Sequence, residues 1–580
     1  MRQTARPHPL LAALALALPA LATHAHAPTP EATAWAQEAA AERTGPPVWR
    51  VRFADATTAR RAAISHHDAV LESDWPNASL VMALDAAEQA RLAPHALSFE
   101  PAAEFMARRE AMLSALQAQA RPRLLGAEAA AAPGAIPGYA CYETVEETHA
   151  AAAALVAAHP RLARYQPIGP SWEKTAGQGG WDLQVLRLSN EDVAPPAGQD
   201  KPRLFINAAI HAREYVTAPL ALAFATELLQ GHGQDADATW LLDHHEVHLL
   251  LHTNPDGRKK AETGLWWRKN TNQAYCGAQS TARGADLNRN FSHSWNVTNG
   301  RGSSGNPCAE TYRGPSAASE PETQAIEAYV RSLWPDRRRK GQQAPAPADT
   351  SGVHIDLHSY GRLVLWPWGF TAQPTGNATA LQTLGRRFAF HNGHFPEQSI
   401  GLYPTDGTSD SISYGELGVA AYTFEMGDSF FQDCTSYAES IKPGNLAALR
   451  YAARVVRAPY LLPAGPDTLN PRLLDAEVPA GTPARLRARI DATRFSQANG
   501  QEPTPAVAAA QAFVGTPPWL PGAVAIPLKA SDGAFDSPRE TVQGRLPTLG
   551  LAPGRHLVWV QGLNTNGQAG PVSATFLTVR

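Results

Sequence analysis

The chain has 580 residues, too many for a single hydrophobic core, and at roughly 100–200 residues per domain its length predicts about three domains. A formal net charge of −3 provides no basic excess for holding a phosphate backbone, so a nucleic acid is not an expected partner. The 44% of hydrophobic and 18% of charged residues are typical of globular domains.

The first segment has the features of a secretory signal peptide, predicted over residues 1–27. Arginines precede an uncharged, apolar run over residues 10–22, and small residues follow it. Cleavage after Ala25 is an alternative to cleavage after Ala27, because Pro28 directly follows the second site. The apolar run is too short to span a bilayer, and no later segment has about 18 consecutive apolar residues. A secreted or periplasmic protein without a membrane span is therefore expected.

The four cysteines are expected to form disulfides, because thiols outside the cytoplasm tend to pair. Four cysteines allow three sets of pairs. Cys276 and Cys308 flank one loop-rich segment and are predicted to pair, which leaves Cys141 for Cys434. Zinc binding by cysteine is disfavoured, since no Cys-x-x-Cys spacing occurs.

Residues 46–118 are predicted to form a small α+β sandwich with the order βαββαβ. Its expected elements are a strand at 48–53, a helix at 56–67, strands at 69–71 and 79–84, a helix at 86–92 and a strand near Leu97. Residues 119–137 are rich in Ala, Gly, Pro and Arg, and they predict a linker.

Residues 138–460 alternate strands with helices, which favours an α/β domain with a mixed, largely parallel sheet and helices on both faces. Thr144 and Glu147 form a capping box before a helix that reaches His159. The strands expected next are 182–188, 204–210 and 247–251; a helix follows the second strand to Leu229, and another at 445–456 closes the domain. Residues 337–352, rich in Arg and Pro, predict a surface insertion.

Residues 461–580 predict an all-β domain of the immunoglobulin-like sandwich type. Proline and glycine recur between short apolar segments in this region. Its last part reads as a strand at 554–561, a turn at 564–570 and a strand at 572–579.

Two candidate metal ligands follow the apolar strand at 204–210. His211 and Glu214 lie three residues apart, a spacing that at the start of a helix lets an imidazole and a carboxylate face a common point. A catalytic zinc ion often takes two His and one Glu from the protein and leaves one position for water. His358 best supplies the second histidine, because it ends an apolar strand, and ligands gather at the carboxyl ends of strands in open α/β sheets.

A second histidine-rich segment, residues 244–248, is a weaker candidate. A zinc-binding helix would need a histidine four residues after His245, but Leu249 stands there and the segment alternates like a strand. We expect no metal site in this segment.

A zinc hydrolase also needs a proton carrier and cations for the developing oxyanion. Glu425 lies among apolar residues of a predicted strand, where burial would raise its pKa toward that of a general base. Two loop segments place Arg268, Asn288 and Arg289 as further polar candidates. A guanidinium suits a substrate carboxylate, because it binds both oxygens at once.

Over residues 139–459 the chain resembles the zinc metallocarboxypeptidases of the carboxypeptidase A/B type. Seven motifs occur in the order seen in that family: His211-Ala-Arg-Glu214, Thr253-Asn-Pro-Asp-Gly257, Trp267-Arg-Lys269, Asp286-Leu-Asn-Arg-Asn290, Cys308-Ala-Glu-Thr-Tyr-Arg-Gly314, His358-Ser-Tyr360 and Thr423-Phe-Glu425. Seven ordered matches are far more specific than any one of them.

The resemblance implies a role for each matched residue. It implies that His211, Glu214 and His358 hold one Zn²⁺ ion per chain, that Asp286 orients His211, that Glu425 is the general base and that Arg268 stabilises the oxyanion. It further implies that Asn288 and Arg289 grip the free C-terminal carboxylate, and that Arg213 is an outer carboxylate-binding residue.

The resemblance also extends to the specificity loop. Tyr403 corresponds to the mobile tyrosine that closes over the substrate, and Asp410 to the base of the specificity pocket. An acidic residue there resembles enzymes that remove C-terminal Lys or Arg. The chain departs from the family after this point, with Ser411-Ile412 where an Asp-Trp pair is frequent, so Asp410 as a loop-capping residue is the alternative.

The role of the N-terminal domain and the substrate class stay open at this stage. The domain could be an inhibitory propeptide, with Arg121 or Arg123 as processing sites, or a permanent accessory domain. The favoured substrates are peptide or protein C-termini, handled by a monomer. A cell-wall peptidase, an amidase for amino-acid conjugates, or a non-catalytic binding protein are the alternatives. The Asn288-Arg289 pair and Tyr403 favour peptide C-termini, and the retention of Glu425 favours catalysis.

Overall fold

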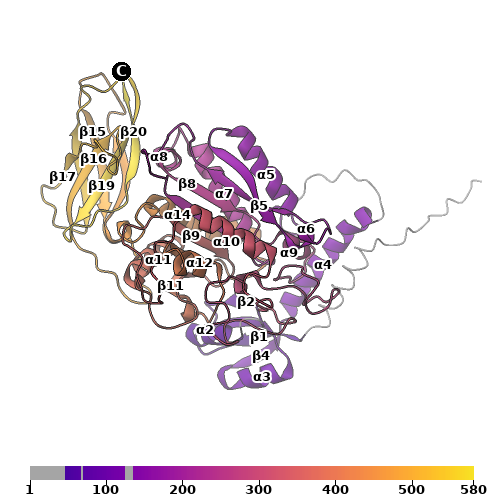
Figure 1. The fold of residues 1–580 in the computed structure, drawn as a ribbon. Coiled ribbons are helices and arrows are strands. Elements are labelled where there is room, and N and C mark those ends of the chain that lie inside the picture. The colour runs from indigo at the N-terminus through magenta and orange to yellow at the C-terminus, as the bar shows by residue number, and fades with distance from the viewer. Residues whose placement is uncertain (1–45, 67–68, 125–134) are drawn as a thin grey trace, which may run out of the picture.

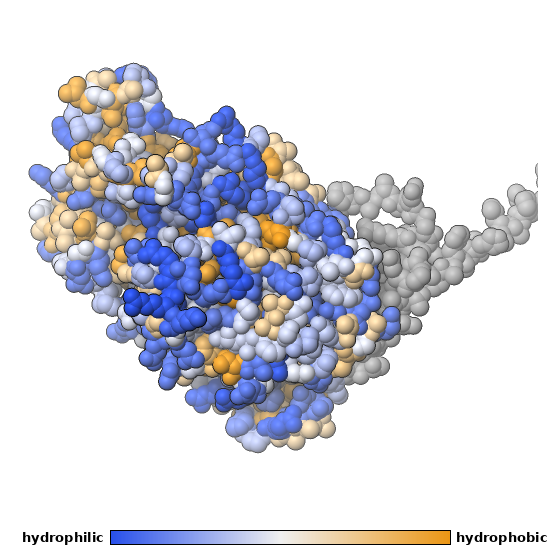
Figure 2. Space-filling view, viewed as in Figure 1, coloured by the Kyte–Doolittle hydropathy of each residue, from blue (hydrophilic) through white to orange (hydrophobic). Residues whose placement is uncertain are grey.

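The computed structural model describes residues 46–66, 69–124 and 135–580. A central α/β domain carries a small α+β domain at one end and an all-β domain at the other (Figure 1). In the view of Figure 2, hydrophilic side chains cover most of the central domain, and hydrophobic patches stand out on the β domain. The signal peptide predicted over residues 1–27 lies outside the described residues.

The N-terminal domain has the predicted order of elements. They are β1 Val48–Arg52, α2 Ala56–Ser65, β2 Val70–Asp74, β3 Ser79–Ala83, α3 Ala86–Leu92 and β4 Ser98–Pro101. The four strands form an antiparallel sheet in the order β2-β3-β1-β4. Asp85 and Glu88 form a capping box that starts α3.

The predicted linker starts too early in the sequence. Helix α4, Ala103–Leu124, was not predicted, and it runs through the first six residues assigned to the linker at 119–137. Alanine, glutamate, glutamine, leucine and arginine, which are all strong helix formers, dominate this segment and outweigh the single Pro122 near its end. Arg121 and Arg123 therefore lie in a helix, and residues 125–134 of the predicted linker are outside the described residues.

The central domain is built on one mixed sheet of eight strands in the order β11-β10-β12-β9-β7-β8-β6-β5. Its strands are β5 Ala163–Pro170, β6 Asp182–Leu188, β7 Arg203–Ala208, β8 Glu246–Leu250, β9 Val353–His358, β10 Leu363–Trp366, β11 Phe395–Gln398 and β12 Ala420–Glu425. The inner strands β12, β9, β7 and β8 are parallel to one another, and the antiparallel pairings lie toward the edges. The prediction of a mixed, largely parallel sheet is confirmed.

Helices cover both faces of this sheet, as predicted. They are α5 Val145–Ala158, α6 Trp172–Thr175, α7 Thr217–Gly231, α8 Ala236–His244, α9 Pro255–Ala261, α10 Pro321–Leu333, α11 Ala378–Asn392, α12 Ser409–Gly415, α13 Cys434–Ser436 and α14 Lys442–Val455. The chain also has short 3₁₀ turns, at η1 Ala93–His95 of the N-terminal domain and at η2 Leu287–Arg289, η3 Ser399–Gly401 and η5 Leu462–Ala464 further along. A π-turn lies at η4 Tyr437–Ile441. Strand β7 sends Leu204 and Ile206 into the core under α7, α11 and α14, and Phe205 into the core under α10 and α12.

Two smaller predictions about this domain have different outcomes. Helix α8 ends at His244 and β8 begins at Glu246, so the histidine-rich segment forms no zinc-binding helix, as expected. Residues 337–352 contain no helix or strand, but they are only partly a surface insertion. The buried Arg338 donates hydrogen bonds to carbonyls of its own loop and to the carbonyl of Gly415, which anchors the loop.

The C-terminal domain is all-β, as predicted. Its strands are β13 Asp467–Leu473, β14 Glu477–Val478, β15 Ala484–Asp491, β16 Val507–Val514, β17 Ile526–Ala530, β18 Arg539–Leu546, β19 Gly554–Asn564 and β20 Ser573–Val579. They follow the order β13-β15-β18-β17-β16-β19-β20-β14, in which β17 joins the two halves. Alternate residues of β15, among them Leu486 and Ile490, fill the core between the halves.

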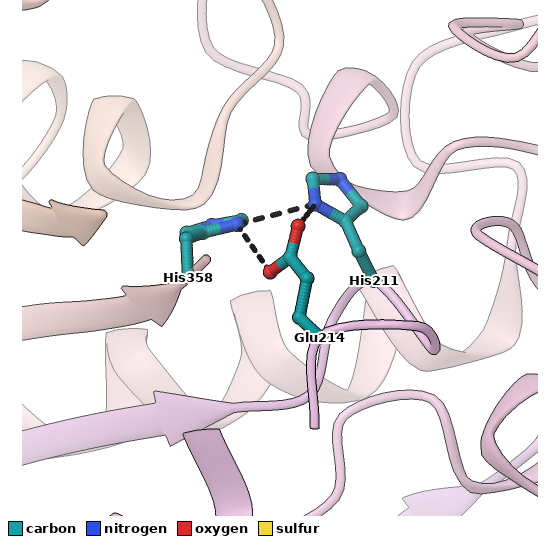
Figure 3. Close-up of side chains that lie close together, drawn as sticks. All are labelled: His211, Glu214 and His358. Carbon is teal, nitrogen blue, oxygen red and sulfur yellow. Dashed lines mark hydrogen bonds and ion pairs between the residues drawn. The ribbon is translucent and has the colours of Figure 1, made fainter. Parts of the chain in front are cut away.

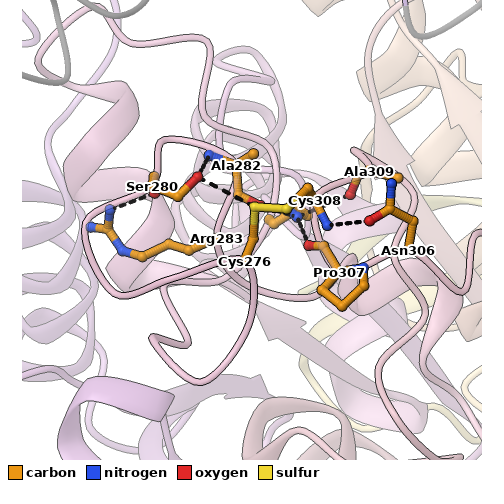
Figure 4. Close-up of a disulfide and its surroundings, with 9 residues drawn as sticks. Cys276, Ser280, Ala282, Arg283, Asn306, Pro307, Cys308 and Ala309 are labelled. Atoms are coloured by element: carbon orange, nitrogen blue, oxygen red, sulfur yellow. Dashed lines mark hydrogen bonds between the residues drawn. A yellow bond between two sulfur atoms is a disulfide. The ribbon is translucent and has the colours of Figure 1, made fainter.

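Both predicted disulfides are present. Cys276 pairs with Cys308 between two loops (Figure 4), and Cys141 pairs with Cys434. Within the described parts of the chain, the structure has no helix with the length and apolar character of a membrane span.

Candidate metal centre

The predicted metal ligands lie at the carboxyl ends of two neighbouring strands. Strands β7 and β9 pair in parallel, with Ala208 opposite Leu357, so the residues that follow them emerge at the same edge of the sheet. His358 is the last residue of β9, and His211 follows β7 after a short turn.

His211 and Glu214 lie in this turn and not in a helix, which corrects the sequence prediction. The backbone passes through the left-handed region at Ala209, with φ of 54°, and helix α7 begins only at Thr217. The hydroxyl of Thr217 accepts a hydrogen bond from the Ala209 amide and donates one to the Glu214 carbonyl, which fixes the turn.

The three side chains converge on one point (Figure 3). The distances are 2.8 Å from His211 Nδ1 to Glu214 Oε1, 3.1 Å from His358 Nδ1 to Glu214 Oε2, and 3.2 Å between the two Nδ1 atoms. All three residues are buried. Two imidazole nitrogens and a carboxylate form the donor set that a catalytic zinc ion prefers, so the residues present fit this metal.

Carboxylates on the outer side hold both imidazole rings. His211 Nε2 lies 3.1 Å from Asp286 Oδ1, the partner predicted for it. His358 Nε2 lies 3.0 Å from Asp356 Oδ2, a partner that was not predicted. The signal was present in the sequence, because Asp356 and His358 are two residues apart on one strand and share a face. These contacts fix which nitrogen of each ring faces the centre.

The charges of the centre shift the pKa of the groups around it. Burial raises the pKa of Glu214, but the two imidazoles outweigh it and hold this pKa below its usual range. Burial lowers the pKa of His358, and the carboxylates of Asp356 and Glu214 reverse that shift. Burial opposes ionisation of Asp286, whose pKa is nevertheless held low by Arg268 and His211.

Glu425 and Arg268 share one cavity with two of the predicted metal ligands. The cavity has a volume of about 360 Å³, and His211, Glu214, Arg268 and Glu425 are among its lining residues. Glu425 ends β12 directly opposite His358 in the parallel register, and burial raises its pKa to about 8. Arg268 donates two hydrogen bonds to Asp286 Oδ2, at 3.1 and 2.9 Å.

The residues predicted to bind the substrate lie around this centre. Asn288 Nδ2 is 3.0 Å from His358 Nε2, and Arg289 donates a hydrogen bond to the Asn288 carbonyl at 2.7 Å. The guanidinium of Arg289 lies 5.9 Å from the ring of Tyr403, which also lines the cavity. Arg213 lines it as well, 3.1 Å from Glu310 Oε2.

Asp410, like Asn288 and Arg289 but unlike Tyr403 and Arg213, is not among the residues that line the cavity. It is buried in the first turn of α12, where the Thr408 hydroxyl donates a hydrogen bond to its carboxylate at 2.6 Å. Burial raises its pKa.

The N-terminal domain closes part of the same cavity, which the sequence did not reveal. Residues from this domain in the lining are Thr57, Arg60, Arg61, Ala63, Val70 and Trp75. The backbone amide of Ser73 donates to the Asp428 carbonyl at 3.0 Å, which joins β2 to the segment after β12. A second cavity of about 930 Å³ lies between the two domains.

Comparison with known proteins gives concordant matches. The zinc carboxypeptidase family model matches residues 148–445. Carboxypeptidase A1 of Rattus norvegicus is 30% identical over 334 residues, which cover 56% of this chain and 72% of that protein. A zinc carboxypeptidase of Saccharothrix mutabilis subsp. capreolus is 30% identical over 298 residues, covering 50% of this chain and 62% of that protein. The solved carboxypeptidase A of Helicoverpa armigera shares the fold, with a TM-score of 0.53 and 21% identity, over 72% of this chain and 97% of that one.

Proposed function

The chain belongs to the zinc carboxypeptidase family, and we propose that its metal-dependent removal of C-terminal residues takes place at His211, Glu214 and His358, with Glu425 beside them. The observation that carries this proposal is that one nitrogen or oxygen atom from each of these three buried side chains lies within 4.8 Å of the others. A zinc ion held there polarises a carbonyl group and lowers the pKa of water.

Glu425 is the proposed proton carrier. It takes a proton from the attacking water and later delivers it to the nitrogen of the departing amine. Its position opposite His358 in the sheet and its raised pKa of about 8 support the role, because a general base works best with a pKa near the working pH. Arg268, held by Asp286, is the proposed donor to the negative charge that develops on the carbonyl oxygen.

The substrate carboxylate is the proposed ligand of Asn288 and Arg289. Arg289 Nε is buried and lacks a hydrogen-bond partner among the described residues, so a donor remains for a carboxylate. Tyr403 is proposed to close over the bound substrate. Arg213 is proposed to bind the substrate carboxylate at an outer position. Recognition of a free carboxylate makes the enzyme an exopeptidase.

The preference for C-terminal Lys or Arg is the finer part of the proposal and depends on Asp410. Burial raises the pKa of the Asp410 carboxyl, so a cationic substrate side chain beside it would stabilise its charged form. Its hydrogen bond from Thr408 supports the competing role of a loop-capping residue equally well.

The N-terminal domain is proposed to restrict access to the site, as a propeptide or a standing cover. Arg60 and Trp75 line the cavity that holds the ligands, so a protein substrate would meet this domain first. Export, with the predicted signal peptide removed, is part of the same proposal.

The test is release of the last residue from matched peptides that end in Arg, Lys, Phe or Leu, each with a free or an amidated C-terminus. We expect release from the free acids alone, loss of release with a zinc chelator, and recovery on adding zinc. Faster release of Arg and Lys, abolished by Asp410→Asn, would support the pocket role of Asp410. Equal release from amidated peptides would contradict the exopeptidase proposal. Limited proteolysis of the full chain before the assay tests the cover, because it should raise activity toward protein substrates.

A further inference from the structure

One face of the C-terminal domain carries a row of cations that the peptidase site does not use. Arg485, Arg487 and Arg489 alternate with the buried residues of β15, so their side chains lie together on the exposed face. At about 3.3 Å per residue, successive arginines on one face of a strand are about 7 Å apart.

Neighbouring strands extend the row into a patch. Arg545 of β18 lies opposite Arg485, and Arg472 of β13 lies opposite Arg487. Lys529 of β17 lies opposite Gln543, which itself lies opposite Arg487. We call these residues the cationic face: Arg472, Arg485, Arg487, Arg489, Lys529 and Arg545. All six are exposed.

Most of this charge is uncompensated. Arg485 forms two hydrogen bonds with Asp475, at 2.7 and 2.8 Å. For the other five side chains the structure records no ion pair or hydrogen bond within the part of the chain that it describes. Like charges directly opposite one another destabilise a sheet. The fold therefore carries an electrostatic cost here that a ligand of opposite charge would relieve.

The row leads into a concave junction with the central domain. Arg489 lines a cavity of about 460 Å³ between the two domains, together with Arg450, Arg454 and Arg494. The acidic residues of this cavity already have partners: Glu227 pairs with Arg450 at 3.1 Å, Asp235 accepts a hydrogen bond from the Ala238 amide, and Asp237 accepts hydrogen bonds from Ser573 and Ala574. The row of arginines thus leads from an open face to a groove, which it reaches at Arg489.

The open face and the groove beside it together favour one class of polyanion as the ligand. A flat lipid surface can touch the open face but cannot enter the junction beside Arg489. Single-stranded nucleic acids bind through aromatic platforms, and the exposed face of β15 and its neighbours presents arginine, lysine, threonine and glutamine instead. A linear chain with a negative group on each repeating unit can follow the row and enter the junction.

We propose that the cationic face binds a linear anionic polysaccharide that carries carboxylate or sulfate groups. Arginine is suited to both groups, because its guanidinium presents two parallel N–H donors to two oxygens. Binding there would hold the peptidase on an anionic polysaccharide matrix through a domain other than the one that carries the candidate metal centre. The inference is independent of the proposed peptide specificity.

The experiment compares binding of the full chain to immobilised heparin, polygalacturonate and neutral dextran. The tested variant is Arg487→Glu/Arg489→Glu/Arg545→Glu. The control variant, Arg339→Glu/Lys340→Glu/Arg555→Glu, reverses the same number of exposed charges outside the cationic face. We expect the native chain and the control to bind the anionic chains and not dextran. The tested variant should bind at least about tenfold more weakly, since three ion pairs are lost.

A folding defect is separated from a binding defect by two readouts, the thermal unfolding midpoint and the release of a C-terminal residue from a short peptide. In the tested variant, peptide release should match the native chain, and the unfolding midpoint should not fall below the native value, because reversing these charges removes their mutual repulsion. Equal binding by the native chain and the tested variant, or no binding to either anionic chain, would overturn the proposal. Tighter binding to anionic lipid vesicles or to double-stranded DNA than to heparin would also overturn it, because the occupant would then belong to another class.

Discussion

The two flanking domains contact the central domain in different ways. The C-terminal domain shares its core, since Phe513, Trp559 and Val572 belong to the same hydrophobic cluster as the helices over the sheet. Cavities of about 930 and 360 Å³ lie at the N-terminal interface, and cavities of about 460 and 330 Å³ lie at the C-terminal interface. Close packing stabilises an interface and cavities weaken it. The C-terminal domain is therefore continuous with the central core, whereas the largest of these four cavities lies between the N-terminal domain and the centre.

A buried arginine at the C-terminal interface shows the same difference between the two flanking domains. Arg387 of α11 is completely buried, donates to the carbonyls of Pro463 and Gly465, and lies 3.6 Å from the ring centre of Phe495. The cations at the N-terminal interface are less buried: Arg109 lies over Trp266 of the central domain at 4.9 Å. Arg60 lies over Trp75 of its own domain and over Phe395 of the central domain, at 4.7 and 5.7 Å.

The largest expected effect concerns the candidate metal centre, whose cavity is lined in part by the N-terminal domain and not by the C-terminal domain. Glu425→Gln removes the proposed proton carrier and should lower kcat by about 10²–10⁴-fold, in the full chain and after removal of the N-terminal domain alike. Steady-state kinetics on a short peptide measures it. The matched control is Glu397→Gln, the same change on another side of the cavity, which should retain kcat. If removing the cover restored the activity of Glu425→Gln, Glu425 would act in docking and not in catalysis.

The next effect tests whether the β domain is integral. Arg387→Ala leaves Asp467 with one cationic partner, Arg494, and should lower the free energy of unfolding by about 3 kcal/mol. Denaturant unfolding measures the loss, with exposed Arg339→Ala as a control expected within about 0.5 kcal/mol of the native chain. We also expect the central and C-terminal domains to unfold in one transition. Two separate transitions in the native chain would contradict the contrast between the flanking domains.

A smaller effect is expected at the N-terminal interface. Trp75 lines both cavities between the domains, and Trp75→Ala should weaken docking of the cover by about 2 kcal/mol. Faster cleavage of the N-terminal domain by trypsin and higher activity on a protein substrate would both follow. Leu97→Ala, at a position 70% exposed in the same domain, is the control. Unchanged cleavage would mean that the cover is held mainly elsewhere.

The smallest expected effect is a pH dependence confined to this interface. Burial raises the pKa of Glu397 to about 7 from 4.5, against the opposing influence of Arg60. If departure of the cover exposes Glu397, the docked state holds a proton that the open state has released between these two pH values. Docking should therefore weaken as the pH rises from about 5 to about 7. Cleavage of the native chain relative to Glu397→Gln, measured from pH 5 to 8, should rise with pH; a flat ratio would exclude Glu397 as the cause.

Much of the fold could be predicted because its signals are local. Alternation at β1, the capping box at Thr144 and the rise in proline and glycine content near residue 461 each depend on a few adjacent residues. The errors arose where local composition was ambiguous. Helix α4 was hidden by the Ala-rich and Arg-rich segment that also suits a linker. The turn that carries His211 was mistaken for a helix start, because a spacing of three residues suits both.

The sequence by itself determined the predicted donor set of the centre, His211, Glu214 and His358, and the neighbouring Glu425, since all four stand in recognisable motifs. It also determined the order of the three domains and the cysteine pairs. Only the tertiary structure decided what surrounds the centre: the partnership of Asp356 with His358, the position of Asp410 outside the cavity lining, and the cover provided by Arg60 and Trp75. The physical reason is distance along the chain. Side-chain type and local spacing are written in adjacent residues, whereas a cavity depends on packing between segments hundreds of residues apart.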